Sequence, residues 1–561
     1  MKKRVLATML SLMVAAPMLF GCDMTAAAPA AEAVQEAVEE KAEEVTTEVA
    51  EAVEEQAEEV QEAVEEQVEE VAEAVEEAVA PGKMDELTEI NFFTSNNKSA
   101  SNEKVKELED AINAISEPEI NVHVNLITAD SANYRTQMPL ALASGESYDL
   151  VFMMPMPPIN LTAMYSASQL MDISPYLEQY GPDILDVAGK YLDAVTVNGG
   201  IYMIPNIRNY ASAEWWVIGQ KYIDEAGLKD DFFAVETVDD VEAICEKLYD
   251  QFGIPVFAGA KNEDSMIQYH GTGGELLASS GSYEENTLVI DNLGDNLYVL
   301  AVDPETDTVY NIYDTEEFVE SCKKNQEWYD KGWIYKDSAF SEESQETICK
   351  NGAAMSIVVT SELGVEANKQ ASFNMPVYAV KFKNALVTSG VVSRFGLGVP
   401  STAAEPEAAV AFANLLYTNG DLNNILDWGI EGKDWELVDG EAAYIGGDAD
   451  NAEWHQFAFA FGNLFVSTPW QGEGADNRIR SKEENDAAEV SKYLGFVLNT
   501  DELQNIVTAL FSVTEEYKYQ LALGSWDEAK YQEYLQKLKD AGVDEYIAAA
   551  QAQLDEWLAN K

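Results

Sequence analysis

Histidine, cysteine and basic residues are all scarce in this 561-residue chain. Its three histidines, His123, His270 and His455, are scattered singly, which argues against a His-rich metal site and offers little to histidine-based catalysis. Only 34 lysines and arginines face 101 acidic residues, for a net charge of −67. Because such a chain repels phosphate backbones, we expect no nucleic-acid partner. We also expect no metal or other cofactor.

The apolar segment Leu6–Phe20 is too short to span a bilayer as a resident helix. It follows the basic residues Lys2–Arg4 and ends at Gly21-Cys22, so residues 1–21 are typical of a secretion signal. The ending resembles a bacterial lipobox, although Phe20 replaces the usual small residue before Gly21. We therefore expect Cys22 to carry the lipid, palmitate included, that anchors the protein at the extracellular face of the cell membrane. The alternative is an ordinary signal peptide that happens to contain a cysteine.

Only three cysteines remain once Cys22 is set aside: Cys245, Cys322 and Cys349. Their odd number allows one disulfide at most, and spacing does not reveal connectivity. Cys322–Cys349 is one candidate pair. We favour three buried thiols.

Residues 22–86 form an acidic tether rich in Ala, Glu and Val, with 20 glutamates and one lysine between residues 32 and 77. The segment Ala37–Val45 recurs in similar form at 52–60 and 63–71. Ala and Glu favour helix, but Glu–Glu repulsion and a thin Val/Ala stripe weaken it. A coiled-coil oligomerisation stalk and a solvated, partly helical spacer are both compatible with this pattern, and we favour the spacer.

From Leu87 onward the pattern alternates between strand and helix. Strands are predicted at 89–94, 120–127 and 148–153, and helices at 105–115 and 134–144. This order implies an open α/β sheet, whose ligands bind beyond the carboxyl ends of the strands. Those ends are Ser95–Asn97 and Met153–Pro157.

The third predicted strand and four segments that follow it form a specific combination. These five segments are Tyr148–Met153, Leu170–Tyr176, Val197–Pro205, Asn351–Ile357 and Arg394–Ser401. Together they resemble the family 1 extracellular solute-binding proteins of ABC importers, the class that contains maltose-binding protein. Asn424–Trp435 is similar to a motif of a lipoprotein branch of that family, with Trp428 and Trp435 where the branch usually has Tyr. That branch often ends in a helical domain of unassigned role, and Tyr531–Trp557 has the same pattern.

The resemblance implies an α/β fold of the two-lobe periplasmic-binding-protein type, with a hinge and a preceding helical low-complexity tether. Lobe one comprises residues 87–205 plus 390–425, and lobe two comprises 206–389 plus 426–561 with the C-terminal helices. Closure about the hinge would trap the ligand. The implied function is a lipid-anchored receptor that delivers a small-molecule ligand, with oligosaccharide the first choice, to ABC permease subunits.

Aromatic faces and planar polar side chains are the groups that bind a neutral sugar. Those expected on interlobe loops are Asn96, Asn97, Met154, Arg208, Tyr210, Arg394, Trp428, Glu431 and Trp470, and Trp470 and Tyr210 rank first. Two have structural alternatives: Glu431 could pair with Lys433 or cap a turn, and Arg394 could form a buried interlobe ion pair. We expect Trp215, Trp216, Trp328 and Trp333 to be packing residues instead.

No motif of an enzyme is present: the chain lacks Gly-x-Ser-x-Gly, a Walker loop and His-Glu-x-x-His. We therefore expect no catalysis. Paired carboxylates carry no information in so acidic a chain, so a surface glycoside hydrolase stays open as an alternative. A sugar sensor or adhesin without a transport role is another, and a cationic solute or a peptide is the rival ligand. Asp448–Glu453 is interpreted as a solvated acidic loop.

Overall fold

The computed structural model describes residues 82–561 except 97–98, 157, 212, 260–290, 296, 298, 342, 385, 447–451, 455 and 457. The secretion signal, Cys22, the tether, Asn97 and most of the acidic loop lie outside these residues. The chain divides into the units Met1–Ala80 and Pro81–Lys561, and only the second is described. Its helices include none with the length and apolarity that a bilayer crossing requires.

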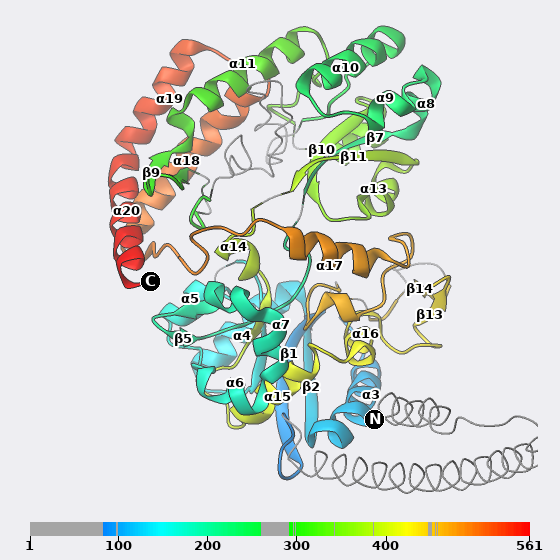
Figure 1. Cartoon of the computed structure of the whole chain (residues 1–561), viewed down its shortest axis with the longest axis vertical. Coiled ribbons are helices and arrows are strands. Elements are labelled where there is room, and N and C mark those ends of the chain that lie inside the picture. Colours follow the sequence, from blue (N-terminus) through cyan, green and yellow to red (C-terminus); the bar gives the residue numbers. More distant parts are fainter. Residues whose placement is uncertain are drawn as a thin grey trace, which may run out of the picture. The chain divides into compact units, whose positions relative to one another are not determined.

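A five-stranded sheet in the order β2-β1-β3-β12-β6 organises the first of two large cores (Figure 1). Its strands are β1 (Thr88–Asn96), β2 (Val122–Asp130), β3 (Leu150–Met153), β6 (Ile204–Pro205) and β12 (Gly396–Gly398). β1 pairs in parallel with β2 and β3, whereas β12 runs antiparallel to β3 and β6. The three parallel strands, as predicted, end at one edge of the sheet.

Helices on this sheet begin and end at recognisable signals. The side chain of Ser101 caps α3 by accepting from the Lys104 amide, and Asn121, in the left-handed conformation, ends it. Pro406 opens the fully buried α15. The elements around the sheet are α3 (Asn102–Ile120), α4 (Ser131–Ser144), α5 (Leu161–Ser166), α6 (Ser174–Tyr180), α7 (Pro182–Ala188), η1 (Gly189–Val195), α15 (Pro406–Leu415) and α16 (Gly420–Trp428).

The first core extends beyond the crossing that we expected near Leu426. Trp454, Ala460 and Phe461 are buried in the same cluster as the strands of the five-stranded sheet. The Trp454 indole donates to the Leu426 carbonyl (2.8 Å). Trp454, Ala460 and Phe461 therefore pack with the five-stranded sheet, although they follow residue 426, where lobe two was expected to begin. An apolar residue is recognisable in a sequence, but the core that it joins is set by long-range packing.

A three-stranded sheet in the order β10-β7-β11 belongs to the other half of the unit. Trp216 is fully buried on β7 (Ala213–Gly219), with its ring 5.1 Å from that of Phe232 and 5.5 Å from that of Phe257. Trp215, Trp328 and Trp333 are buried as well, so the prediction that all four tryptophans are packing residues is confirmed. The other elements here are β10 (Ser356–Ser361), β11 (Val377–Asn384), β8 (Leu300–Asp303), β9 (Thr308–Asn311), α8 (Gln220–Ala226), α9 (Lys229–Phe233), α10 (Val238–Phe252), α11 (Glu316–Asp330), α12 (Gln345–Lys350) and α13 (Val365–Phe373).

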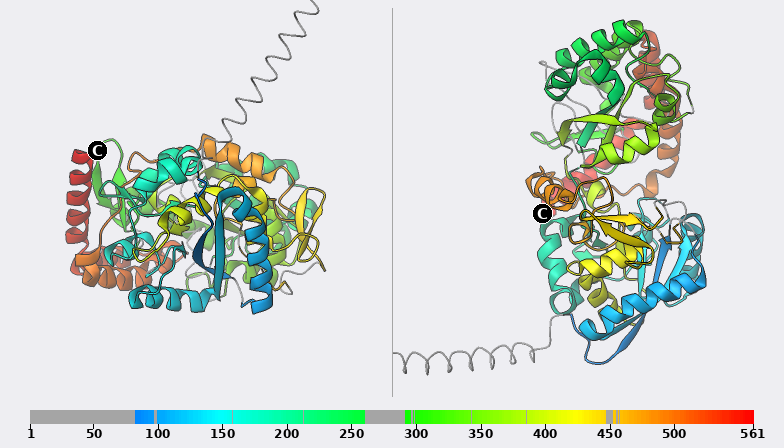
Figure 2. Two further views of the ribbon diagram at one scale, coloured as in Figure 1. Left: turned by 90° about the horizontal axis from the view of Figure 1, so that it is seen from below. Right: turned by 90° about the vertical axis from the view of Figure 1, so that its right-hand side faces the viewer.

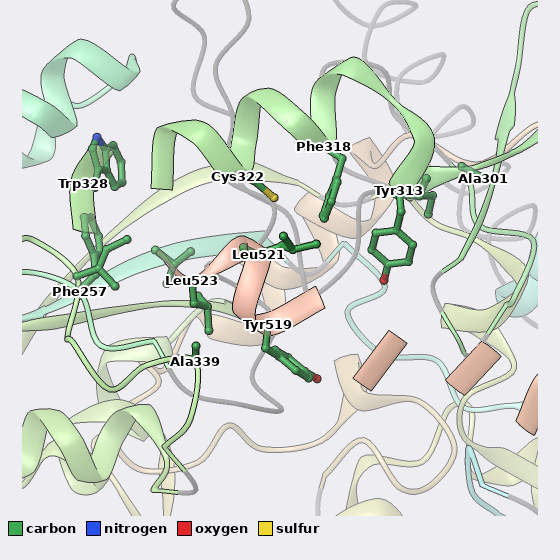
Figure 3. Packing of buried hydrophobic residues seen from close by; sticks show 14 of the residues in the cluster. Phe257, Ala301, Tyr313, Phe318, Cys322, Trp328, Ala339, Tyr519, Leu521 and Leu523 are labelled. Carbon is green, nitrogen blue, oxygen red and sulfur yellow. The ribbon is translucent and has the colours of Figure 1, made fainter. Parts of the chain in front are cut away.

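The C-terminal helices α18 (Gln504–Ala522), α19 (Glu528–Asp540) and α20 (Val543–Asn560) complete the second core (Figures 1 and 2). Leu510, Tyr534, Tyr546 and Leu554 are buried in the same cluster as Trp216. The end of α18 brings Leu521 and Leu523 into this core together with Cys322 of α11 and Phe257 (Figure 3). These helices are therefore an integral part of the lobe.

Cys245, Cys322 and Cys349 are all buried free thiols. The preferred interpretation of the three cysteines is thus confirmed, and no Cys322–Cys349 disulfide forms. Burial raises the pKa of the Cys245 and Cys322 thiols well above its ordinary value, which keeps them protonated and unreactive.

A small separate cluster joins segments that are distant in the sequence. It contains Tyr191, Ala194, Tyr210, Val387, Val392 and Leu494. We refer to it as the hinge cluster, because Tyr210, Val387 and Val392 lie close to residues 205 and 390, where the chain was expected to pass between lobes, and Leu494 packs against them. A parallel bridge between Val387 and Val490 connects two of the segments.

Candidate functional site

Four aromatic side chains gather beside the end of α16. Trp428 is the last residue of that helix, Trp435 and Tyr444 pair across the hairpin of β13 (Trp435–Val438) and β14 (Glu441–Tyr444), and Trp470 follows in a loop. The ring of Trp470 lies 5.0 Å from that of Trp428 and 4.6 Å from that of Tyr444. Trp470 alone of the four keeps part of its surface exposed. We call Trp428, Trp435, Tyr444 and Trp470 the aromatic cluster.

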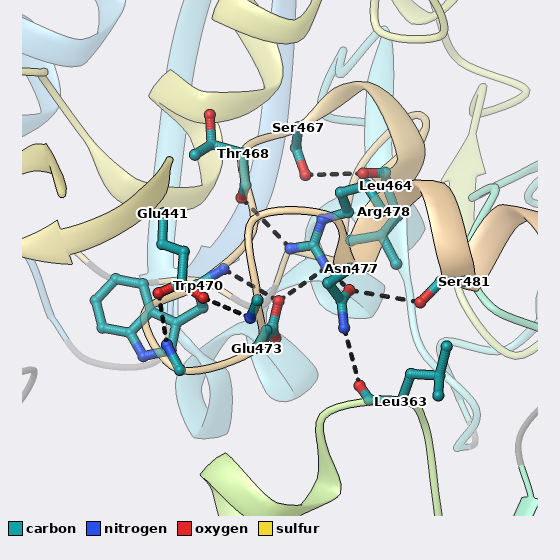
Figure 4. A network of polar contacts seen from close by, with 12 residues as sticks. Leu363, Glu441, Leu464, Ser467, Thr468, Trp470, Glu473, Asn477, Arg478 and Ser481 are labelled. Carbon is teal, nitrogen blue, oxygen red and sulfur yellow. Dashed lines mark hydrogen bonds and ion pairs between the residues drawn. The ribbon is translucent and has the colours of Figure 1, made fainter. Parts of the chain in front are cut away.

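The loop that carries Trp470 is held by two carboxylates (Figure 4). The Trp470 amide donates to Glu473 Oε2 at 3.0 Å, and Arg478 Nη1 donates to the same oxygen at 3.0 Å. Glu441 accepts from the amides of Gly472, at 3.1 Å, and Gly474. Both glycines have a positive φ near 100°, which L side chains rarely adopt. These bonds fix the backbone of the loop that carries Trp470.

Asp427, next to Trp428, is fully buried, and neither of its carboxylate oxygens has a hydrogen-bond partner among the described residues. The Gln456 amide donates to the Asp427 carbonyl at 3.1 Å, and the Gln456 side chain donates to the Ser95 carbonyl at 2.7 Å. These contacts place Asp427 beside the carboxyl end of β1. Burial raises the pKa of the Asp427 carboxyl well above its ordinary value, and the Arg478 charge opposes the rise.

Replacing Asp427 with Asn is expected to stabilise the protein by about 1–3 kcal/mol at pH 7.5. The folded-state pKa is raised above the unfolded one, so the carboxyl lowers stability as pH rises from the unfolded value toward the folded value. The gain should therefore shrink when thermal unfolding is measured at pH 4.5. Asp421→Asn, which changes an exposed carboxylate on the same helix, is the control. A variant less stable than the parent at pH 7.5 would contradict the prediction.

Two predicted site residues belong to the aromatic cluster, namely Trp428 and Trp470. Asn96 is the last residue of β1 and is buried, with its carbonyl accepting from Ser131 Oγ at 3.2 Å. Met154 is partly buried against the first core. Asn97 lies outside the described residues, so its prediction is not addressed by the structure.

Arg208 and Tyr210 lie at the hinge cluster. The Tyr210 hydroxyl is buried and donates to the Asn206 carbonyl at 2.8 Å, and burial raises its pKa. Arg208 donates from Nη2 to the Val391 carbonyl at 2.8 Å, and its Nη1 lies 3.8 Å from Glu362 Oε1. In this structure both side chains connect hinge segments and leave little surface free for a ligand.

Arg394 and Glu431 are both exposed. Exposure of Arg394 is contrary to the alternative of a buried ion pair, and the partly buried ion pair near the hinge cluster joins Arg208 and Glu362. Lys433 pairs with Glu107 and not with Glu431. Among the described residues, no group of three or more His, Cys, Asp or Glu side chains is arranged to hold a metal ion.

Sequence reasoning missed Asp427, Tyr444 and Arg478. The only available signal for Asp427 was its place inside the Asn424–Trp435 motif, three residues after Asn424, on the same face of a helix. The sequence alone does not show which of its 101 acidic residues is buried.

The family models account for most of the second unit. One described as "Bacterial extracellular solute-binding protein" matches residues 100–422, and one described as a domain of unknown function matches residues 492–559. The chain belongs to the bacterial extracellular solute-binding protein family. The family resemblance seen in the sequence is thereby confirmed.

Individual relatives of this solute-binding protein support the family assignment. A "Carbohydrate ABC transporter substrate-binding protein" of Streptococcus pneumoniae is 24% identical over 464 residues, covering 80% of this chain and 87% of the relative. The crystal structure of the N-glycan transport solute-binding protein NgtS from Streptococcus pneumoniae matches with a TM-score of 0.68 at 22% identity, covering 84% of this chain and 99% of that one. A human-milk-oligosaccharide (HMO) binding protein from Bifidobacterium longum infantis matches with a TM-score of 0.56 at 14% identity, covering 84% and 99%. The expected two-lobe α/β fold is confirmed by these matches.

Proposed function

We propose that this solute-binding protein is a lipid-anchored extracellular receptor that binds an oligosaccharide and delivers it to the permease subunits of an ABC transporter. Family membership supports the receptor role. The carbohydrate assignment draws on the Streptococcus pneumoniae relative and on similar solute-binding proteins solved with Man1GlcNAc and with kestose, together with the HMO-binding protein. Attachment through Cys22 draws on the lipobox-like sequence alone.

The observation that carries the proposal is the partly exposed Trp470 ring, on a loop whose backbone amides are bonded to Glu441 and Glu473. An indole face covers the C–H face of a sugar ring. The connection from Asp427 through Gln456 to Ser95 keeps the cluster at the carboxyl edge of the sheet, where ligands of open α/β sheets bind. We assign supporting ligand contacts to Asn96, Met154, Arg394 and Glu431, and we keep Asn97 as a candidate on its sequence position alone. Arg208 and Tyr210 are left as residues of the hinge segments, because both are buried there.

Isothermal titration calorimetry with a mixed panel tests the proposal. The panel contains Man1GlcNAc, Man5GlcNAc and kestose as neutral sugars, an alginate oligosaccharide as an acidic sugar, and spermidine as a cationic solute. We expect one neutral sugar or more to bind with a stoichiometry of one, and chromatography to show the sugar unchanged afterwards. Binding of spermidine without binding of any sugar would refute the carbohydrate assignment. Cleavage of a bound sugar would indicate a hydrolase instead.

A further inference from the structure

Two neighbouring residues at the aromatic cluster have polar atoms that are buried without a hydrogen-bond partner. Both carboxylate oxygens of Asp427 and the indole Nε1 of Trp428 are in this state within the described part of the chain. Arg478, which acts on Asp427 electrostatically, also has an unpartnered Nε. The structure thus leaves an acceptor and a donor unsatisfied on consecutive residues of α16, and a further donor unsatisfied on Arg478.

Another buried aspartate of this protein has hydrogen-bond donors for its carboxylate. Asp295, in the second core, accepts from the amides of Leu297, Val299 and Leu300 at 2.8–3.0 Å and from the Tyr546 hydroxyl at 2.8 Å. A buried carboxylate with no such partners costs free energy that a structural role does not require. Unsatisfied buried groups of this kind are retained where function needs them.

We propose that Asp427 and Trp428 form the polar part of the ligand site, where the carboxylate of Asp427 accepts hydrogen bonds from ligand hydroxyls and Trp428 Nε1 donates to a ligand oxygen. The inference rests on the proposed function and specifies the chemistry of its ligand. Adjacent hydroxyl groups on one monosaccharide ring can both donate and accept hydrogen bonds. The Trp470 ring, 5.0 Å from Trp428, then covers the apolar face of the same sugar.

This chemistry selects among ligand classes. A uronic or sialic acid would bring a second carboxylate beside the buried Asp427, where its negative charge would lose hydration without gaining a donor from Asp427. A polyamine would satisfy Asp427 but would leave the Trp428 N–H without an acceptor. A neutral sugar satisfies both groups, so the site favours a neutral oligosaccharide.

Access to the buried pair requires movement of a covering side chain. Trp470 is the member of the aromatic cluster with exposed surface, and its ring packs directly on Trp428. Displacement or rotation of this ring on ligand entry opens a path to Trp428 and Asp427, and the ring then closes on the sugar.

Titration calorimetry with Man1GlcNAc, kestose and spermidine, on the full chain and its variants, tests the inference. Asp427→Asn keeps the size of the side chain and removes its charge, and we expect it to weaken sugar binding about 10–100-fold. Trp428→Phe keeps an aromatic ring and removes the N–H, and we expect a loss of about 3–10-fold. Asp421→Asn is the matched control and should bind as the parent does. Thermal unfolding of each variant verifies that it is folded.

The outcomes separate the inference from the proposed function. If the parent binds a sugar and Asp427→Asn binds it equally well, the inference is wrong and the receptor proposal stands. If the parent binds neither sugar, the proposed function fails for these ligands and the inference that rests on it falls as well. If Asp427→Asn abolishes spermidine binding while no sugar binds, the neutral-sugar assignment is overturned in favour of a cationic ligand.

Discussion

Deleting residues 501–561 is expected to leave a protein that cannot fold its second core. The deletion removes α18–α20 and with them the buried side chains of Leu510, Tyr534, Tyr546 and Leu554. Truncating one large core side chain costs about 2–5 kcal/mol, so removing several exceeds the total stability of about 5–15 kcal/mol that is typical of a domain. Soluble yield, circular dichroism and limited proteolysis measure the effect.

The matched control for this deletion removes only residues 559–561, which are exposed at the end of α20. It should fold as the parent does. A soluble, protease-resistant product from the longer deletion would contradict the prediction and would show that the helices are an appended module. The family model of unknown function covers residues 492–559, so the expected result would give that region a structural role in completing the lobe.

Replacing Trp470 with Ala is expected to weaken oligosaccharide binding at least about 30-fold, equivalent to about 2 kcal/mol. The variant loses the face that stacks on the sugar, although its backbone amide can still donate to Glu473. Trp470→Phe, with a smaller ring, should retain part of the affinity. Calorimetry with the neutral sugar that the parent binds provides the measurement.

Trp526→Ala is the control for loss of an indole outside the site. Trp526 is also partly exposed, but it packs against the second core. It should lower stability without changing sugar affinity. Unchanged affinity in Trp470→Ala would place the ligand away from the aromatic cluster and would remove the main support for the proposed site.

Local patterns were sufficient to predict the three parallel strands of the first sheet and the helices α3 and α4. The predicted strand at 120–127 corresponds to β2, and the predicted helix at 105–115 lies inside α3, because alternation and helical spacing are properties of short segments. The burial of Trp454 and Phe461 in the first core was not predictable, because their partners lie more than 25 residues away in the sequence. Helical character at the C-terminus was predictable, but its burial against α11 was not.

The candidate site was predictable in part, for a related reason. Trp470 and Tyr210 both follow crossings or turns and ranked equally, yet one ring is partly exposed and the other is enclosed by Tyr191 and Arg208. Sequence shows which residues have aromatic faces, whereas only packing shows which faces remain accessible. Asp427 was overlooked because its distinguishing property, burial without a partner, exists only in three dimensions.

The contact between Tyr546 and Asp295 spans 251 residues, and it sets the order in which the chain can fold. Such non-local contacts form late, because a long loop must close before they contribute. The second core contains residues from Trp216 to Leu554. It therefore cannot be completed before α20 has been synthesised, and we expect its final packing to be one of the last steps in the folding of this chain.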